Sequence, residues 1–69
     1  MMINKTYYLN LLEEVDSARL FAHCLELDGV NTICIKDVIF DNMWYTKVIV
    51  NCDYDVIEEL EAVLGCYQR

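Results

Sequence analysis

Residues 31–52, NTICIKDVIFDNMWYTKVIVNC, decide the fold because they predict one long β-hairpin. β-Branched and aromatic residues dominate residues 32–40 and 43–52, and Asp41-Asn42 between them is typical of a tight turn. Successive side chains of a strand point to opposite sides of the sheet. A hairpin centred on Asp41-Asn42 therefore assigns every residue of both strands to one of two faces.

The two faces of this hairpin predict different roles. The first face has an ordinary core composition, with Ile33, Ile35, Ile39, Trp44, Val48 and Val50. The second face carries Cys34, Lys36, Val38, Phe40, Met43, Tyr45, Lys47 and Ile49, and it is too apolar for a surface left to water alone. Trp44 is expected to be buried, so that Trp44→Ala should cost about 3–5 kcal/mol of stability.

The segment before the hairpin predicts a strand and a helix. Alternating apolar and polar residues favour a strand over residues 5–12, and helical spacing of apolar residues favours a helix over residues 17–28. Asp16 or Ser17 is the expected N-cap of this helix, because its side-chain oxygen can accept a backbone N–H bond. Gly29 is the expected left-handed residue at the C-terminal end.

The segment after the hairpin predicts a second helix, over residues 56–64. Asp55 and Glu58 have the spacing of a capping box at its start, and Gly65 marks its expected end. The element order is then β-α-β-β-α. This order resembles a ferredoxin-like α+β fold that lacks the last strand, with two helices on one face of a three-stranded antiparallel or mixed sheet. The resemblance places the first strand beside the third, as an open edge that can accept a strand from another chain.

Length and charge limit the classes of function. A chain of 69 residues predicts a single domain, and a hydrophobic fraction of 57% favours an oligomer or a bound partner. The formal net charge of −7 disfavours direct binding of nucleic acid or of an anionic membrane, and it suits a protein partner with a basic surface. Because the N-terminus lacks a signal-peptide pattern, the expected location is cytoplasmic.

No motif in the sequence indicates catalysis or a bound metal. His23 is the only histidine, and no sequence signal of a nucleophile elbow lies near it in the first predicted helix. Cys24, Cys34, Cys52 and Cys66 form no close pair, so we expect free thiols that pack as small apolar groups. The sequence therefore predicts a protein that is not an enzyme and that has no cofactor.

Acidic residues cluster along the second predicted helix. Asp53, Asp55, Glu58, Glu59 and Glu61 occur with no basic residue between Lys47 and Arg69. A solvated helix face with favourable N-terminal charges is the simplest interpretation. A rigid set of carboxylates can also imitate nucleic-acid phosphates in the groove of a nucleic-acid-binding protein. We include these five residues among the candidate binding residues.

Aromatic residues on the first and third predicted strands allow two interpretations. Tyr8 and Tyr45 would project from the uncovered sheet face, as the base-stacking aromatics of RNA-recognition domains do. The acidic charge and the absence of the glycine-aromatic motif of those domains argue against this function. A protein-binding surface of Tyr8, Phe40, Met43 and Tyr45, extended by Val38 and Ile49, is the expected alternative.

In size, acidity and Asn/Ile/Tyr-rich composition, the chain resembles small inhibitor proteins encoded by bacteriophages, including anti-CRISPR and anti-restriction proteins. The resemblance implies a non-enzymatic protein that acts in a host cytoplasm and sterically inhibits a basic or nucleic-acid-handling protein. Two alternatives stay open. The first is an ACT-like dimeric module that binds a regulatory ligand, and the second is a plain dimeric structural protein. A homodimer would form through the first strand or through the open sheet face.

Overall fold

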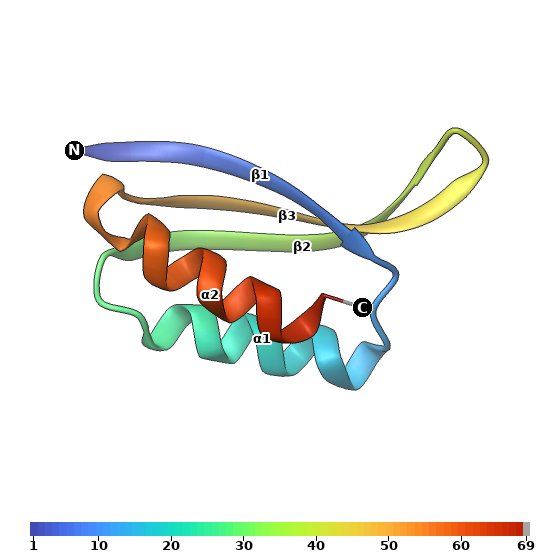
Figure 1. The fold of residues 1–69 in the computed structure, drawn as a ribbon, viewed down its shortest axis with the longest axis horizontal. Coiled ribbons are helices and arrows are strands. Elements are labelled where there is room, and N and C mark those ends of the chain that lie inside the picture. The colour runs from blue at the N-terminus through green and yellow to red at the C-terminus, as the bar shows by residue number, and fades with distance from the viewer. Residues whose placement is uncertain (69) are drawn as a thin grey trace.

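The computed structural model describes residues 1–68 as a three-stranded antiparallel sheet with two helices on one side (Figure 1). The strands are β1 (Met2–Asn10), β2 (Val30–Phe40) and β3 (Met43–Asp53), in the order β1-β3-β2 across the sheet. Helices α1 (Glu14–Glu26) and α2 (Ile57–Tyr67) cover one face, and the short 3₁₀ helix η1 (Tyr54–Val56) leads into α2. The α+β class, the element order and the edge position of β1 agree with the sequence prediction.

The predicted hairpin is formed by β2 and β3. Their pairing runs from Phe40 opposite Met43 to Val30 opposite Cys52, with one irregularity near Asn31. Asp41 and Asn42 have φ angles of 53° and 62°, which are the left-handed values of a two-residue type I′ turn. Aspartate and asparagine adopt this region more readily than other non-glycine residues do, so the turn chemistry fixes the hairpin register.

The core lies between the helices and the covered face of the sheet. Alternate residues of β3 are fully buried there, and the Oγ1 of buried Thr46 accepts a hydrogen bond from the backbone N–H of Leu12 at 2.8 Å. The helices contribute apolar residues from their inner sides. The buried core residues of the strands and helices are Leu9, Val48, Val50, Cys52, Leu20, Cys24, Leu60, Val63 and Leu64.

The prediction that Trp44 and Ile39 are buried is wrong. Both lie on the same face as Val48 and Val50, but Trp44 is 55% exposed and Ile39 is 60% exposed. The reason is length: a strand of 11 residues spans about 36 Å, whereas a helix of 13 residues spans about 20 Å. The end of the hairpin therefore extends beyond both helices (Figure 1).

The first strand and first helix both begin earlier than predicted. β1 runs from Met2 to Asn10, and α1 starts at Glu14, so that Asp16 and Ser17 lie inside its first turn. The strand ends before Leu12, which is buried and whose N–H donates a hydrogen bond to Thr46. The helix begins soon after, because the N–H of Ser17 already donates to the carbonyl oxygen of Glu13 at 2.9 Å. Glu13, which occupies the N-cap position, makes no side-chain capping bond.

The end of α1 also differs from the prediction. The helix stops at Glu26, and Gly29 follows further on with φ of 108°. Gly29 allows a close approach of two chain segments: its carbonyl oxygen accepts a bond from the N–H of Asp53 at 2.8 Å. A Cβ atom at Gly29 would lie 3.3 Å from the Cβ of Val56.

The boundaries of α2 are wrong in the sequence prediction at both ends. Asp53, and not Asp55, caps the segment, since its carboxylate accepts a hydrogen bond from the N–H of Asp55 at 3.1 Å. The helix continues through Gly65 to Tyr67. Glycine inside a helix costs about 1 kcal/mol relative to alanine. Packing of Leu64 and Tyr67 against the core outweighs this cost.

Candidate binding surfaces

The hairpin arm, which we define as residues 39–44, is the most exposed apolar part of the sheet. Ile39 and Trp44 lie on its helix side, and Phe40 and Met43 lie on its other side. The four side chains are between 55% and 69% exposed. Because the arm extends beyond the helices, both of its faces are open to solvent (Figure 1).

The face of the sheet opposite the helices, which we call the open face, carries the predicted aromatic residues. Tyr8, Phe40 and Tyr45 line one hollow of about 420 Å³ there. The Nζ of Lys47, which pairs with Tyr8 across the strands, lies 5.8 Å from the centre of the Tyr8 ring. The structure thus brings Tyr8, Phe40 and Tyr45 together as predicted, and Met43 pairs with Phe40 beside them.

A ladder of asparagine side chains crosses the other end of the open face. The Nδ2 of Asn31 donates to the Oδ1 of Asn51 at 3.0 Å, and the Nδ2 of Asn51 donates to the Oδ1 of Asn4 at 2.8 Å. These bonds link β2, β3 and β1 in one row. They hold the strands in register at the end of the sheet away from the arm.

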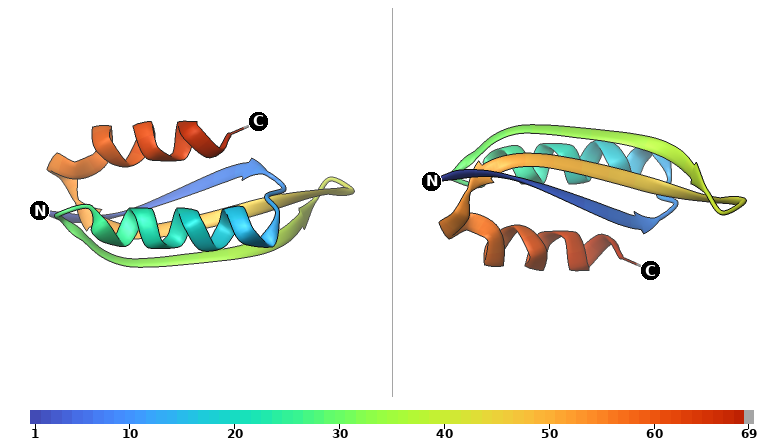
Figure 2. Two further views of the ribbon diagram at one scale, coloured as in Figure 1. Left: turned by 90° about the horizontal axis from the view of Figure 1, so that it is seen from below. Right: turned by 90° about the horizontal axis from the view of Figure 1, so that it is seen from above.

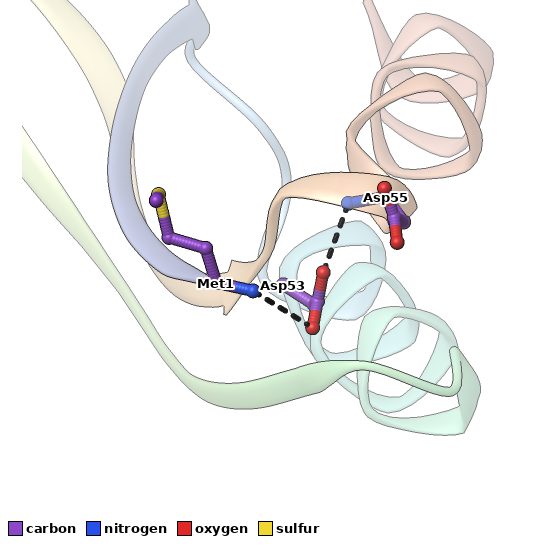
Figure 3. A network of polar contacts seen from close by, with 3 residues as sticks. All are labelled: Met1, Asp53 and Asp55. Atoms are coloured by element: carbon purple, nitrogen blue, oxygen red, sulfur yellow. Dashed lines mark hydrogen bonds and ion pairs between the residues drawn. The ribbon is translucent and has the colours of Figure 1, made fainter.

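The predicted acidic residues do not form one surface. Asp53, Asp55 and Glu59 line a hollow of about 420 Å³ together with Asp28, at the end of the molecule opposite the arm. Figure 3 shows how Asp53 is held there: besides the bond from Asp55, its Oδ2 lies 3.5 Å from the N-terminal amino group of Met1. The backbone hydrogen bond from Asp55 and, to a smaller extent, the charge of this amino group lower the pKa of Asp53.

Glu61 and Glu58 lie apart from that hollow. The hydroxyl of Tyr7 on β1 donates a hydrogen bond to Oε2 of Glu61 at 2.9 Å, which ties α2 to the sheet edge. Burial and this acidic neighbour together raise the pKa of Tyr7. Glu58 is exposed on α2. Figure 2 shows that α2 lies alongside the outer edge of β1, whereas the arm extends from one end of the sheet.

A groove of about 710 Å³ lies between α1 and the β2 edge of the sheet. Phe21, Ile33 and Ile35 form part of its apolar lining, and Glu14 and Asp37 contribute carboxylates. Phe21 is 42% exposed, although the helical pattern places it on the inner side of α1. Ile35 and Asp37 of this groove lie on the same face of β2 as Ile39 of the arm.

Sequence reasoning missed the contribution of Ile39 and Trp44 to the exposed arm, and it missed Asp28 and the groove beside α1. The signal for the arm is present in the sequence as the mismatch between strand and helix lengths. Asp28 has no comparable signal, because its proximity to Asp53 depends on the left-handed turn at Gly29.

Residues 1–68 contain no group of three or more His, Cys, Asp or Glu side chains arranged to hold a metal ion. All four cysteines are free, with Cys24 and Cys52 buried and Cys34 and Cys66 exposed. Within the same residues, neither helix has the length and apolar character needed to cross a membrane. No protein-family model, curated protein or solved structure matches this chain.

Proposed function

We propose that this protein is a non-enzymatic binding protein that inserts its hairpin arm into an apolar groove of a partner protein and inhibits that partner sterically. The observation that carries the proposal is the exposure of four large apolar side chains within residues 39–44. Such a concentration of apolar surface on a small protein is typical of an interaction site. Aromatic and methionine side chains are also enriched in interfaces.

The size of the arm is sufficient for an anchor but not for a whole interface. Aromatic side chains bury about 150–250 Å² each, so the four exposed side chains together offer roughly 450 Å². A stable interface buries about 800 Å² on each partner. We therefore expect adjacent surface to contribute, and the groove that contains Ile33 and Ile35 is a candidate, because these residues share a face of β2 with Ile39 of the arm.

The charges near the arm favour a partner with a basic rim. Asp41 is in the turn at the tip of the arm, and Glu14 and Asp37 line the groove at its base. In this proposal these carboxylates steer the association, and the candidate residues Asp53, Asp55, Glu58 and Glu59 do not. The latter lie towards the far end of a molecule 36 Å long, and a Debye length at physiological salt is about 8 Å. A nucleic-acid-handling protein, as in the resemblance to bacteriophage inhibitors, offers such a basic surface.

Affinity capture from an extract of the native host tests this proposal. The wild type is compared with Phe40→Glu and Trp44→Glu, and the matched control is Leu25→Glu, which changes a side chain of α1 that is 47% exposed and away from the arm. We expect one protein to be retained by the wild type and the control, and to be lost from both arm variants. With that protein purified, the arm variants should dissociate faster, because they remove buried apolar contacts.

The proposal also predicts how salt acts on the complex. Replacing Glu14, Asp37 and Asp41 by their amides should slow association and flatten its salt dependence. Replacing Glu58 and Glu59 in the same way should have little effect. A partner that binds Phe40→Glu and Trp44→Glu with unchanged affinity would show that the arm is not the docking element.

A further inference from the structure

The open face differs sharply in charge from the rest of the protein. Of 12 carboxylates in the chain, none belongs to the residues of β1, β2 and β3 that form this face between the asparagine ladder and the arm. Two lysines do belong to it. The residues concerned are Asn4, Thr6, Tyr8, Thr32, Cys34, Lys36, Val38, Tyr45, Lys47, Ile49 and Asn51.

Lys36 and Lys47 stand directly opposite each other on β2 and β3. Like charges in directly opposed positions destabilise a sheet, so folding alone does not favour this arrangement. The ion pairs formed within residues 1–68 include neither lysine. Both lysines belong to the open face by strand parity, so this part of the face carries positive charge that suits an anionic ligand.

Aromatic rings adjoin this pair of lysines. Tyr8 is beside Lys47 on the neighbouring strand, and Tyr45 is two residues before Lys47 on the same face. Tyr8 and Tyr45 line the same hollow of about 420 Å³, and Tyr8 is 55% exposed. Exposed rings next to cations on a flat sheet are the arrangement on which unpaired bases stack while their phosphates bind basic side chains.

We propose that the open face binds single-stranded nucleic acid, with bases stacked on Tyr8 and Tyr45 and phosphates at Lys36 and Lys47. The net charge of −7 argues against nucleic-acid binding only if the charge is spread evenly, and the structure shows that it is not. The 12 carboxylates all lie outside the part of the open face between the asparagine ladder and the arm. Two phosphate contacts predict weak binding whose logarithm falls with the logarithm of salt concentration with a slope of about −1.4.

This inference goes beyond the proposed function and is separable from it. Protein docking depends on the arm, including Ile39 and Trp44 on its helix side, whereas the nucleic-acid site depends on Tyr8, Lys36, Tyr45 and Lys47. An inhibitor of a nucleic-acid-handling protein that has both surfaces would contact the partner and its nucleic acid together. Variants at Lys36 and Lys47 test the second surface without changing the arm.

Fluorescence anisotropy with labelled oligo(dT) and oligo(U) of 12 nucleotides, in low salt, tests the site directly. We expect saturable binding that the double variant Lys36→Gln, Lys47→Gln abolishes. The matched control is Lys5→Gln, because the Nζ of Lys5 lies 5.9 Å from the Tyr7 ring and that ring packs against the core on the covered side of the sheet. Tyr45→Leu should weaken binding by about fivefold to a hundredfold, since stacking contributes about 1–3 kcal/mol per base.

Two further probes separate this site from a merely cationic patch. A DNA duplex of 12 base pairs should bind far more weakly than the single strand, because its bases are not available for stacking. An oligoglutamate of 12 residues should also bind weakly. Circular dichroism of each variant checks that the fold is intact. The proposal is overturned by an absence of binding at millimolar protein, by equal binding of oligoglutamate, or by Lys5→Gln acting as strongly as the double variant.

Discussion

Strand β3 presents two different surfaces from one run of residues. Thr46, Val48, Val50 and Cys52 are fully buried against the helices, whereas the alternate residues Tyr45, Lys47, Ile49 and Asn51 are partly exposed on the open face. The covered residues are apolar or internally hydrogen-bonded. The open residues are aromatic, cationic, aliphatic and amide side chains. One side of β3 therefore maintains the fold, while the other side is available for binding.

The largest effect should come from the covered side. Leu20 of α1 is fully buried, so Leu20→Ala is expected to lower the free energy of unfolding by about 2–5 kcal/mol. Leu25→Ala, on the same helix but partly exposed, is expected to change it by much less. Urea denaturation followed by circular dichroism measures both. Equal losses from the two variants would contradict the division between covered and exposed sides.

A smaller loss of unfolding free energy is expected from a change at Thr46, a buried polar side chain of the core. Thr46→Val keeps the shape but leaves the N–H of Leu12 without its acceptor, which should cost about 1–3 kcal/mol. The control is Thr6→Val on the open side of β1, where the threonine is exposed and the change should lie within about 0.5 kcal/mol. If Thr46→Val leaves the free energy of unfolding unchanged, the hydrogen bond from the Leu12 N–H to Thr46 does not stabilise the fold.

Alkaline pH should weaken the covered side. Burial raises the pKa of the Cys24 and Cys52 thiols above 9.0, and burial together with Glu61 raises the pKa of Tyr7 above 10.0. The unfolded chain then releases these protons first, so the stability that these three groups contribute is constant below about pH 9 and is lost as the pH increases further. Thermal unfolding between pH 7 and pH 11 measures the decrease. Tyr7→Phe should flatten its upper part, and an unchanged profile in that variant would count against the Tyr7 contribution.

The smallest loss of stability is expected at the arm. Trp44→Ala should cost about 1 kcal/mol or less, because the indole is more than half exposed, and not the larger amount that the sequence pattern suggests. Acrylamide should quench the Trp44 fluorescence efficiently in the native protein. A protected indole, or a loss near 3 kcal/mol, would mean that the arm packs against the body of the molecule.

The sequence predicts the pairing and the faces of β2 and β3 well, because the Asp41-Asn42 turn and the period of two determine both. The edge position of β1 is predicted from the resemblance to a ferredoxin-like element order. It predicts the helix boundaries poorly. The N-cap at Asp53 and the start of α1 depend on tertiary contacts, such as the bond between Leu12 and Thr46, which no local pattern reveals. Strand parity predicts that Tyr8, Phe40 and Tyr45 share a face and can line one hollow. The distance between the acidic residues and the arm depends on the position of α2 in the fold, which parity does not predict. Homodimerisation through β1 stays a prediction.

The order β1-β3-β2 has a consequence for the way the chain folds. During synthesis β1 leaves the ribosome long before β3, its only neighbour in the sheet, whereas β2 and β3 can pair as soon as their turn has formed. Local contacts form faster than distant ones, so the hairpin is the expected folding nucleus and β1 joins it late. Substitutions along β1 should then mainly accelerate unfolding, and substitutions at the Asp41-Asn42 turn should mainly slow folding.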